Sequence, residues 1–219
     1  MRWPLQLRDK QKGIQHTVAD VQLAVDLPRD LRGTHMSRFV ECLQGLEYLE
    51  LGQEERVLDS LKEHLQARSA MMRLSFPYFL QKQAPVSGKV APMDINCIYT
   101  AEKSNKFSLK VRADVPVQTL CPCSKEISDR GAHNQRAVAK IEILANEMVW
   151  LEELAVWADK AASAPVYSLL KRPDEKFVTE HAYDNPRFVE DAVRELALML
   201  DRDRRIKAYR VRVESIESI

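Results

Sequence analysis

The chain has 219 residues, 45% of them hydrophobic and 30% charged, and its formal net charge at pH 7 is +1. This composition is typical of a globular protein that is long enough for one sizeable core or two joined modules. The balanced charge, without any run of Lys or Arg, argues against a nucleic acid partner. No apolar stretch approaches the roughly 20 residues that cross a bilayer, so we expect no membrane partner either.

Two further features of the composition narrow the class of protein. The sequence starts Met1-Arg2-Trp3-Pro4 and shows no apolar signal segment, so we expect a cytoplasmic protein whose four cysteines are reduced. It has six glycines, and neither G-x-G-x-x-G nor G-x-x-x-x-G-K-[ST] occurs. Because these backbone cradles for phosphates are absent, side chains would have to hold the phosphates of any bound nucleotide.

Hydrophobic periodicity predicts the secondary structure. A period of two is typical of antiparallel strands with one solvated face, and helical spacing indicates amphipathic helices. In chain order we predict a strand at 17–27, helices at 36–46 and 57–65, strands at 70–79, 90–100, 106–117 and 135–146, a helix at 150–162, a helix capped by Asn185 with Pro186 at its first position, and a strand at 206–215. The long stretches 118–134 and 163–184 are predicted to be irregular; loops of this length are usually functional or disordered, and both are rich in residues that do chemistry.

The order of these elements predicts an α+β fold. The pattern strand, helix, helix, strand occurs twice, which indicates two related modules, about 14–117 and about 118–219, within one domain of residues 1–219. The sheets would be antiparallel, with paired helices on one face. Strands outnumber what either module could close alone, and a barrel completed by several subunits would remove the open edges. We therefore expect a homo-oligomer.

The first long loop carries residues that suit a metal. Cys121 and Cys123 flank a proline, and His133 follows ten positions later. Thiolate and imidazole are preferred zinc ligands, and this spacing fits a catalytic site better than a structural one. The alternative is that these are reduced loop cysteines and a surface histidine. Cys42 and Cys97 lie within predicted regular elements and are interpreted as packing residues.

Other candidate residues have simpler explanations beside the functional one. Glu175 could complete a metal site, or be a solvated carboxylate, and His181 could shuttle protons or simply be exposed. Glu190 could accept hydrogen bonds from the edge of a guanine, or complement a helix dipole. Thr34 could cap a helix whose start presents His35 and Arg38 to an anion. A triphosphate could be bound by a set of basic side chains, each of which is otherwise an ordinary surface charge: Lys110, Arg112, Lys125, Arg136 and Arg172.

Several motifs together resemble one known family. They are the segments 33–39 (Gly-Thr-His-Met-Ser-Arg-Phe), 121–126 (Cys-Pro-Cys-Ser-Lys-Glu), 131–136 (Gly-Ala-His-Asn-Gln-Arg), 164–167, 171–176 and 185–191. These motifs are similar to those of the type IB GTP cyclohydrolases, a prokaryotic, metal-dependent family with the tunnelling fold. The resemblance runs from about Gln15 to the last residue.

The resemblance implies a site and an assembly. It implies a homotetramer of two-module subunits. It also implies a divalent metal, either zinc or, given the glutamate ligand, manganese or iron. The metal ligands of the family match Cys121, His133 and Glu175. Glu217 matches the family's C-terminal motif and is a further candidate metal ligand. Glu190 would anchor guanine, Cys123 would be a second essential thiol near the metal, and His35, His181 and Cys123 are unranked candidates for the acid–base group. The family's tail continues with a histidine that this sequence lacks, which leaves metal affinity and activity open.

The implied activity is that of GTP cyclohydrolase I, the first step of pterin and tetrahydrofolate biosynthesis. A metal-bound water would attack C8 of guanine, and GTP and water would yield 7,8-dihydroneopterin triphosphate and formate. Three alternatives remain open at this point. They are an NADPH-dependent nitrile reductase of deazaguanine metabolism with the same fold, an archaeal-type cyclohydrolase that yields a cyclic phosphate, and a zinc-stabilised scaffold that binds purines without turnover.

Overall fold

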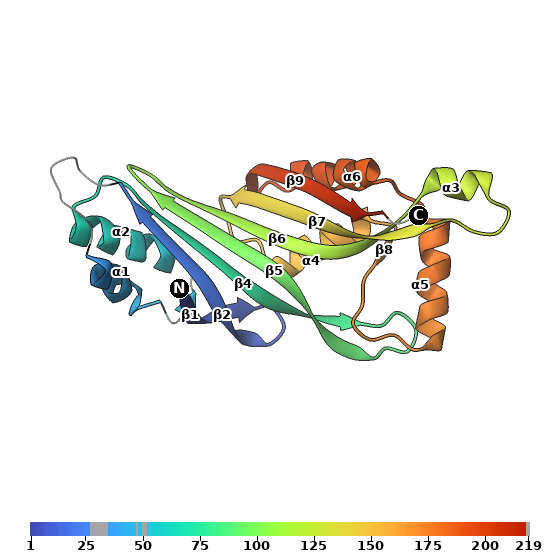
Figure 1. Cartoon of the computed structure of the whole chain (residues 1–219), viewed down its shortest axis with the longest axis horizontal. Coiled ribbons are helices and arrows are strands. Elements are labelled where there is room, and N and C mark those ends of the chain that lie inside the picture. The colour runs from blue at the N-terminus through green and yellow to red at the C-terminus, as the bar shows by residue number, and fades with distance from the viewer. Residues whose placement is uncertain (27–34, 47, 50–51, 218–219) are drawn as a thin grey trace. The chain divides into compact units, whose positions relative to one another are not determined.

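The computed structural model describes residues 1–26, 35–46, 48–49 and 52–217 (Figure 1). Contacts divide the chain into two units, which are described separately. Unit 1 comprises Met1–Tyr78 and Asn96–Val111, and unit 2 comprises Phe79–Ile95 and Arg112–Ile219. The expected module boundary near residue 117 falls inside a strand, β6, and that division into modules stays a prediction.

Within the described residues the chain forms nine strands and six helices, so the α+β class is confirmed. Unit 1 contains β1 (Arg2–Asp9), β2 (Gly13–Val25), α1 (Met36–Leu43), β3 (Tyr48–Leu49) and α2 (Gln53–Leu65). Three strands contribute residues to both units: β4 (Ala70–Gln83), β5 (Val90–Lys103) and β6 (Phe107–Leu120). Unit 2 adds α3 (Pro122–Ile127), β7 (Asn134–Ala145), α4 (Leu151–Ala161), β8 (Ala164–Pro165), α5 (Arg172–Asp184), α6 (Val189–Arg202) and β9 (Ile206–Ile216).

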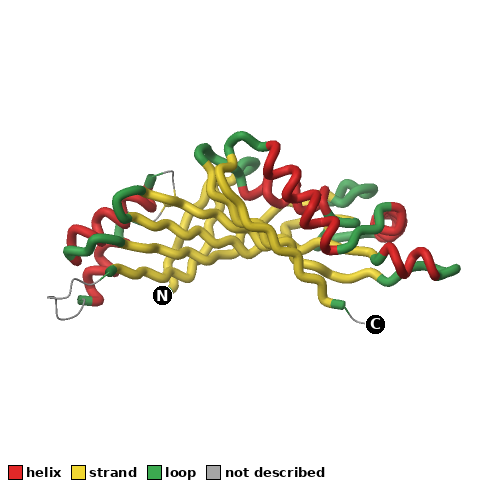
Figure 2. The backbone as a smooth tube through the Cα atoms, turned by 90° about the horizontal axis from the view of Figure 1, so that it is seen from above, coloured by secondary structure: helices red, strands yellow, loops and turns green. Residues whose placement is uncertain are grey.

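In unit 1 the strand order is β3-β1-β2-β4-β5-β6, with β1 antiparallel to β2 and parallel to β3. Helices α1 and α2 pack on each other, and α2 contacts β2 and β3; in Figure 2 these helices, in red, lie alongside the yellow strands. The apolar stripe predicted for α2 is confirmed, because Val57, Leu58, Leu61 and Leu65 are all buried. The inward side chains Met72, Leu74 and Phe76 of β4 are also almost completely buried. The burial of both faces supplies the core of this unit.

In unit 2 the strand order is β4-β5-β6-β7-β9, and β8 pairs with β6. Strand β7 runs antiparallel to β9 over eleven residues of β9, from Arg136 opposite Ile216 to Ala145 opposite Ile206. Helix α6 packs along β9 and against α4. Their facing side chains Leu154, Ala158, Leu196 and Leu200 are buried, together with Ile141 and Ile143 of β7. The strand at 206–215 and the helices at 150–162 and after Pro186 are therefore confirmed.

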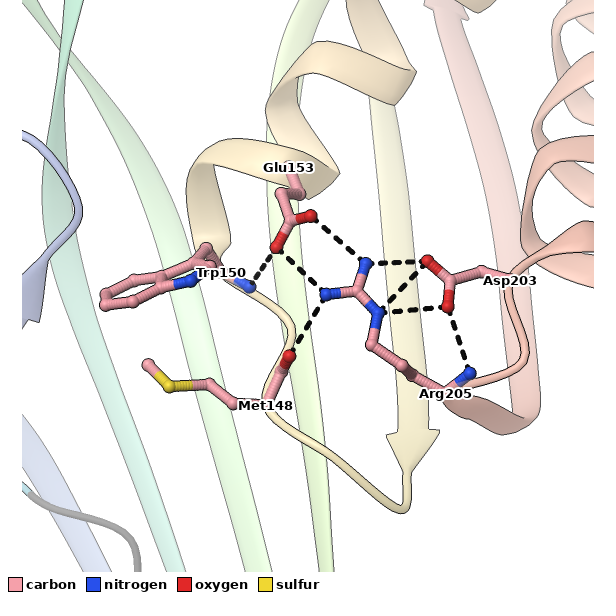
Figure 3. Close-up of polar contacts among 5 residues, drawn as sticks. All are labelled: Met148, Trp150, Glu153, Asp203 and Arg205. Atoms are coloured by element: carbon pink, nitrogen blue, oxygen red, sulfur yellow. Dashed lines mark hydrogen bonds and ion pairs between the residues drawn. The ribbon is translucent and has the colours of Figure 1, made fainter.

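An arginine joins three segments of unit 2 (Figure 3). The Arg205 guanidinium donates to both oxygens of Asp203, to both oxygens of Glu153 and to the Met148 carbonyl, at 2.6–3.3 Å. Glu153 in turn accepts from the Trp150 N–H at 3.0 Å, which fixes the start of α4. The network therefore connects the loop before α4, the helix itself and the turn between α6 and β9.

Three helices of unit 2 have a carboxylate at their third position that stabilises the helix start. Glu153 in α4, Asp174 in α5 and Asp191 in α6 each accept the backbone N–H of the residue before the helix. This bond satisfies one of the donors that a helix start leaves unpaired, and the negative charge complements the helix dipole.

The structure corrects three of the expected elements. The stretches 118–134 and 163–184 are not wholly irregular, because they contain α3 and α5. Helix α6 begins at Val189, and Asn185 instead ends α5, where its side-chain amide donates to the Ala162 and Ser163 carbonyls at 3.0 and 3.2 Å. Helix α1 begins after His35, and the expected cap Thr34 lies outside the described residues.

No helix in the described ranges is long and apolar enough to cross a membrane.

Candidate functional site

The loop at the end of β6 brings Cys121 and His133 together. The Cys121 N–H donates to the His133 carbonyl at 3.1 Å, although the two residues are separated by α3 and the turn that follows it. Cys121 is half-buried and precedes α3, and its Sγ accepts a hydrogen bond from the Ser124 N–H at 3.4 Å. Pro122 at the first helical position requires no N–H partner, which suits this start. The fold therefore holds the backbones of Cys121 and His133 side by side.

His133 is held by its backbone and its ring. Its N–H donates to Ser124 Oγ at 3.1 Å, and its ring Nδ1 contacts the side-chain amide nitrogen of Gln135. Gln135 is buried, and its amide oxygen accepts from Thr119 Oγ1 at 3.5 Å. Since Nδ1 is engaged by the protein, Nε2 is the ring nitrogen that is left to face a ligand.

Glu175 lies near the start of α5, directly after a fixed carboxylate. Asp174 is fully buried and accepts from the N–H groups of Val86 and Ser87 at 2.8 Å each, from Ser87 Oγ at 2.7 Å and from the Lys171 N–H at 2.8 Å. Burial alone would raise the pKa of the Asp174 carboxyl, but these hydrogen bonds together hold that pKa well below its usual range. The turn between β4 and β5 therefore anchors the start of α5.

The face of α5 that carries Glu175 is the one that packs on the loop. Val178 and Ala132 pack against a buried cluster of Leu120, Ala164 and Ala182. Residues three and seven apart share one face of a helix, so Glu175 lies on the side of Val178 and Ala182, one turn nearer the start. Its carboxylate is about half exposed and lies 3.5 Å from the Arg172 guanidinium. Thiol, imidazole and carboxylate therefore come from elements that pack together, although no group of three or more such side chains in the described residues is close enough to form a preorganised metal cluster.

The remaining cysteines divide as expected. None of the four forms a disulfide; Cys42 and Cys97 are buried in unit 1, which confirms their interpretation as packing residues, whereas Cys123 is exposed on α3. Cys42 lies beside Ser60, whose hydroxyl donates to its sulfur at 3.4 Å.

The basic residues proposed for a triphosphate are engaged to different degrees. Lys125 Nζ donates to the Tyr183 carbonyl at 2.6 Å and lies 4.2 Å from the centre of the Tyr183 ring, which ties α3 to the end of α5. Arg112 donates to both oxygens of Asp114 at 2.7 and 2.9 Å, and this hydrogen bonding raises its pKa. Arg136 and Arg172 are exposed in unit 2.

Two of the predicted cations and one predicted histidine belong to unit 1. Lys110 lies 3.6 Å from the Glu102 carboxylate. His35 is exposed at the start of α1, and Arg38 donates to the His64 carbonyl at 2.7 Å. Gly33, which starts this motif, lies outside the described residues.

The other predicted residues are on the surface of unit 2. Glu190 is exposed in the first turn of α6, and Glu217 is exposed after β9. His181 is exposed, stacks on Phe177 with ring centroids 5.6 Å apart, and lines an open cavity of about 700 Å³. The residues that line this cavity are Val156, Asp159, Lys160, Ala162, Pro165, His181, Asp184 and Asn185.

Sequence reasoning missed the residues that support this loop. Ser124 bridges Cys121 and His133, and the buried Gln135 contacts the His133 ring and accepts a hydrogen bond from the buried Thr119. The one available signal is that polar residues stand at inward positions of β6 and β7, where an alternating strand would carry apolar ones.

Comparison with solved structures identifies the class of fold. The chain is similar to uricase from Arthrobacter globiformis, with a TM-score of 0.50, 9% identity, and coverage of 96% of this chain and 77% of that chain. At this identity the likeness shows the fold alone, which is a tunnelling fold. The fold expected from the sequence is confirmed to this extent.

Comparison of sequences identifies the family. The model of the family described as type I GTP cyclohydrolase FolE2 matches residues 1–219. A protein named GTP cyclohydrolase FolE2 from Caldicellulosiruptor saccharolyticus is 51% identical over all of this chain and 86% of its own length. The proteins of that name from Thermotoga maritima and Dictyoglomus turgidum are 52% and 49% identical, again over all of this chain and 85% of their own lengths. The chain belongs to the type I GTP cyclohydrolase FolE2 family.

Proposed function

We propose that the chain acts on GTP through a metal centre at the Cys121 loop. It is an enzyme, a hydrolase with GTP cyclohydrolase I activity, as the relatives of that name support. The reaction converts GTP and water to 7,8-dihydroneopterin triphosphate and formate and belongs to folate biosynthesis. The observation that supports the proposed site is the backbone hydrogen bond between Cys121 and His133, because it holds a cysteine and a histidine side by side in the fold.

The donor set fits a divalent metal. Sulfur, nitrogen and oxygen donors would come from Cys121, His133 and Glu175, and Glu217 is a further carboxylate candidate near the end of the chain. Three protein ligands are typical of catalytic zinc sites, in which a position stays open. Zinc suits the thiolate and imidazole, and the carboxylate would tolerate manganese or iron. When bound, the metal supplies a water of lowered pKa for hydrolysis at C8 of guanine.

The protein's own residues would position the substrate and move protons. The Glu190 carboxylate would accept hydrogen bonds from N1–H and the 2-amino group of guanine, a charge-assisted pair that selects this base. Arg38, Lys110, Lys125 and Arg136 are the proposed triphosphate ligands. Proton transfer would fall to Cys123, which is exposed two residues after Cys121, or to His35 or His181.

Oligomerisation would complete the barrel. Within the described part of the chain, β9 is the last strand of the order and has a neighbour along one edge only. An open edge of eleven residues pairs readily with another chain. We propose that copies of this chain associate there as a homotetramer, in the cytoplasm. Light scattering coupled to size exclusion tests the assembly, and a monomer at micromolar concentration would refute it.

The first experiment separates catalysis from metal binding. The protein is stripped with a chelator, reloaded with zinc or manganese and incubated with GTP, and formate and the pterin product are measured. Cys121→Ala should lose both metal and formate release, whereas Cys42→Ala, the same change at a buried thiol of unit 1, should keep both. A cyclic phosphate in the mass spectrum would indicate the archaeal-type reaction, and metal-loaded protein that binds GTP without releasing formate would refute catalysis.

The second experiment tests guanine recognition. Glu190→Gln retains one acceptor and loses the charge, so the KM for GTP should rise roughly 10- to 100-fold, which is the value of one charge-assisted hydrogen bond. ITP lacks the 2-amino group, so the preference of the wild type for GTP over ITP should largely disappear in this variant. Glu180→Gln, at an exposed carboxylate of α5, is the matched control. An unchanged GTP to ITP ratio in Glu190→Gln would remove Glu190 from the base site.

A further inference from the structure

A buried polar chain stands behind the His133 ring. Thr119 near the end of β6 and Gln135 at the start of β7 are 2% and 7% exposed. The Thr119 hydroxyl lies 3.5 Å from Gln135 Oε1, and Gln135 Nε2 contacts His133 Nδ1. Burying an amide and a hydroxyl costs free energy unless both are hydrogen-bonded, so an apolar pair would serve the sheet better if packing were the only requirement. The chain of contacts ends on a proposed metal ligand.

The backbone of His133 is fixed independently of its ring. Its N–H is bound by Ser124 Oγ at 3.1 Å, and its carbonyl accepts from Cys121 at 3.1 Å. These bonds set where the side chain starts, but they do not set which ring nitrogen carries the proton. Of the described contacts, the one with Gln135 acts on the ring itself.

The orientation of the Gln135 amide selects the tautomer. A neutral imidazole has one N–H donor and one acceptor nitrogen. If the amide NH₂ donates to Nδ1, the proton sits on Nε2 and blocks a metal there. If the amide is turned by half a rotation, Oε1 accepts from Nδ1–H and the Nε2 lone pair is free. The two orientations occupy the same space, since the amide oxygen and nitrogen are nearly equal in size.

Thr119 is compatible with both orientations. Its hydroxyl can donate to Oε1 in the first arrangement and accept from the amide NH₂ in the second. The buried chain is therefore satisfied in either state, and turning the amide requires no other rearrangement. Metal-binding histidines commonly depend on such an outer partner for ring orientation and tautomer.

We infer that Gln135 is a positioning residue that holds His133 as the Nδ1–H tautomer, with Thr119 completing the chain, so that Nε2 presents its lone pair to the metal. The inference rests on the proposed role of His133 as a ligand. It assigns no contact between Gln135 and the substrate.

The test measures zinc affinity by competition with a chromophoric chelator, without substrate. Gln135→Met keeps the length of the side chain and removes both polar groups, and zinc affinity should fall about 10- to 100-fold. Gln135→Glu can only accept at Nδ1–H and should restore affinity to within a few fold of the wild type. In the zinc-loaded protein, the His133 Nδ1–H proton signal should persist in the wild type and in Gln135→Glu, and broaden by exchange in Gln135→Met. His133→Ala identifies this signal among the five histidines.

A double-mutant cycle separates positioning from a general effect on folding. If Gln135 acts through the ring, Gln135→Met should cost no further affinity in a His133→Ala background. Additive losses, or full affinity with an unchanged Nδ1–H signal in Gln135→Met, would overturn the inference. If His133→Ala itself leaves zinc affinity unchanged, the proposed metal site fails instead, so the two failures are distinguishable.

Discussion

Replacing Arg205 should destabilise the protein more than replacing an exposed arginine. Its guanidinium donates to Asp203, to Glu153 and to the Met148 carbonyl (Figure 3). The exposed fraction of the side chain is 27% for Arg205, 17% for Asp203 and 25% for Glu153. Arg205→Met removes these bonds and leaves two carboxylates facing each other in a partly buried site. The planar guanidinium spans both carboxylates, whereas the ammonium of Arg205→Lys reaches one at a time.

The magnitude follows from the number of acceptors. A hydrogen bond to a charged group contributes about 1.5–3 kcal/mol, and three acceptors would give about 4.5–9 kcal/mol without solvent. Because the groups are about a quarter exposed, water and salt reduce this sum, and we expect a loss of about 3 kcal/mol for Arg205→Met and about half of that for Arg205→Lys. In a chain of this length, 3 kcal/mol lowers the melting temperature by roughly 6–12 °C.

The assay is thermal unfolding followed by circular dichroism at one protein concentration, because association shifts the apparent midpoint. Arg194→Met is the matched control, since Arg194 pairs with Asp191 at 3.0 Å but is 68% exposed. If Arg205→Met melts within error of this control, the network is solvated and the reasoning is wrong.

Three further predictions concern buried or paired charges. The hydrogen bond from Arg205 lowers the pKa of Asp203 in the folded protein below its ordinary 3.8. The stability that this bond contributes is therefore present above pH 3.8 and is lost as pH falls through the pKa of the folded protein. In a series of acid unfolding experiments, the difference in stability between the wild type and Arg205→Met should narrow as pH falls. Burial raises the pKa of Glu54, which is 3% exposed and whose Oε2 has no hydrogen-bond partner among the described residues, so stability falls as pH rises through the range between 4.5 and the raised value. Glu54→Gln should therefore add about 1 kcal/mol to the free energy of unfolding at pH 7 and nothing below pH 4, measured by urea unfolding. Lys82 forms an ion pair with Asp159, and their side chains are 11% and 19% exposed. Lys82→Met should lower the free energy of unfolding by about 3 kcal/mol, because it leaves the buried Asp159 carboxylate without its partner, and adding Asp159→Asn should recover part of this loss. Equal stabilities of the single and double variants would contradict this prediction.

Periodicity predicted the elements that carry a regular apolar row. The strands β2, β4, β5, β6, β7 and β9 and the helices α1, α2, α4 and α6 were found this way, because apolar residues recur in each with the period of a strand or of a helix. Helix α5 was missed because it buries little apart from Ala182 and the carboxylate of Asp174, so its sequence shows no stripe. Strand β1 was missed because Pro4 interrupts a short alternation, and pairing with β2 decides its structure.

The candidate site was predictable only where residue type suggests chemistry. Cysteine and histidine are rare enough to stand out, and the fold does place Cys121 beside His133. Glu175 and Glu190 resemble any surface carboxylate, so only the family motifs single them out. Gln135 was invisible for a different reason: its role depends on burial against a neighbouring strand, which one dimension does not record.

The anchoring of Asp174 has a consequence for engineering this chain. Exposed hairpin tips usually accept insertions, tags or cut sites without harm. Here the backbone N–H groups of Val86 and Ser87 at the tip bind the Asp174 carboxylate and so fix the start of α5, 87 or 88 positions later in the sequence. The residue after Asp174 is Glu175. A peptide inserted into that tip would break these hydrogen bonds and release the start of α5. The insertion would therefore displace the proposed oxygen donor Glu175, although every proposed ligand would still be present in the sequence.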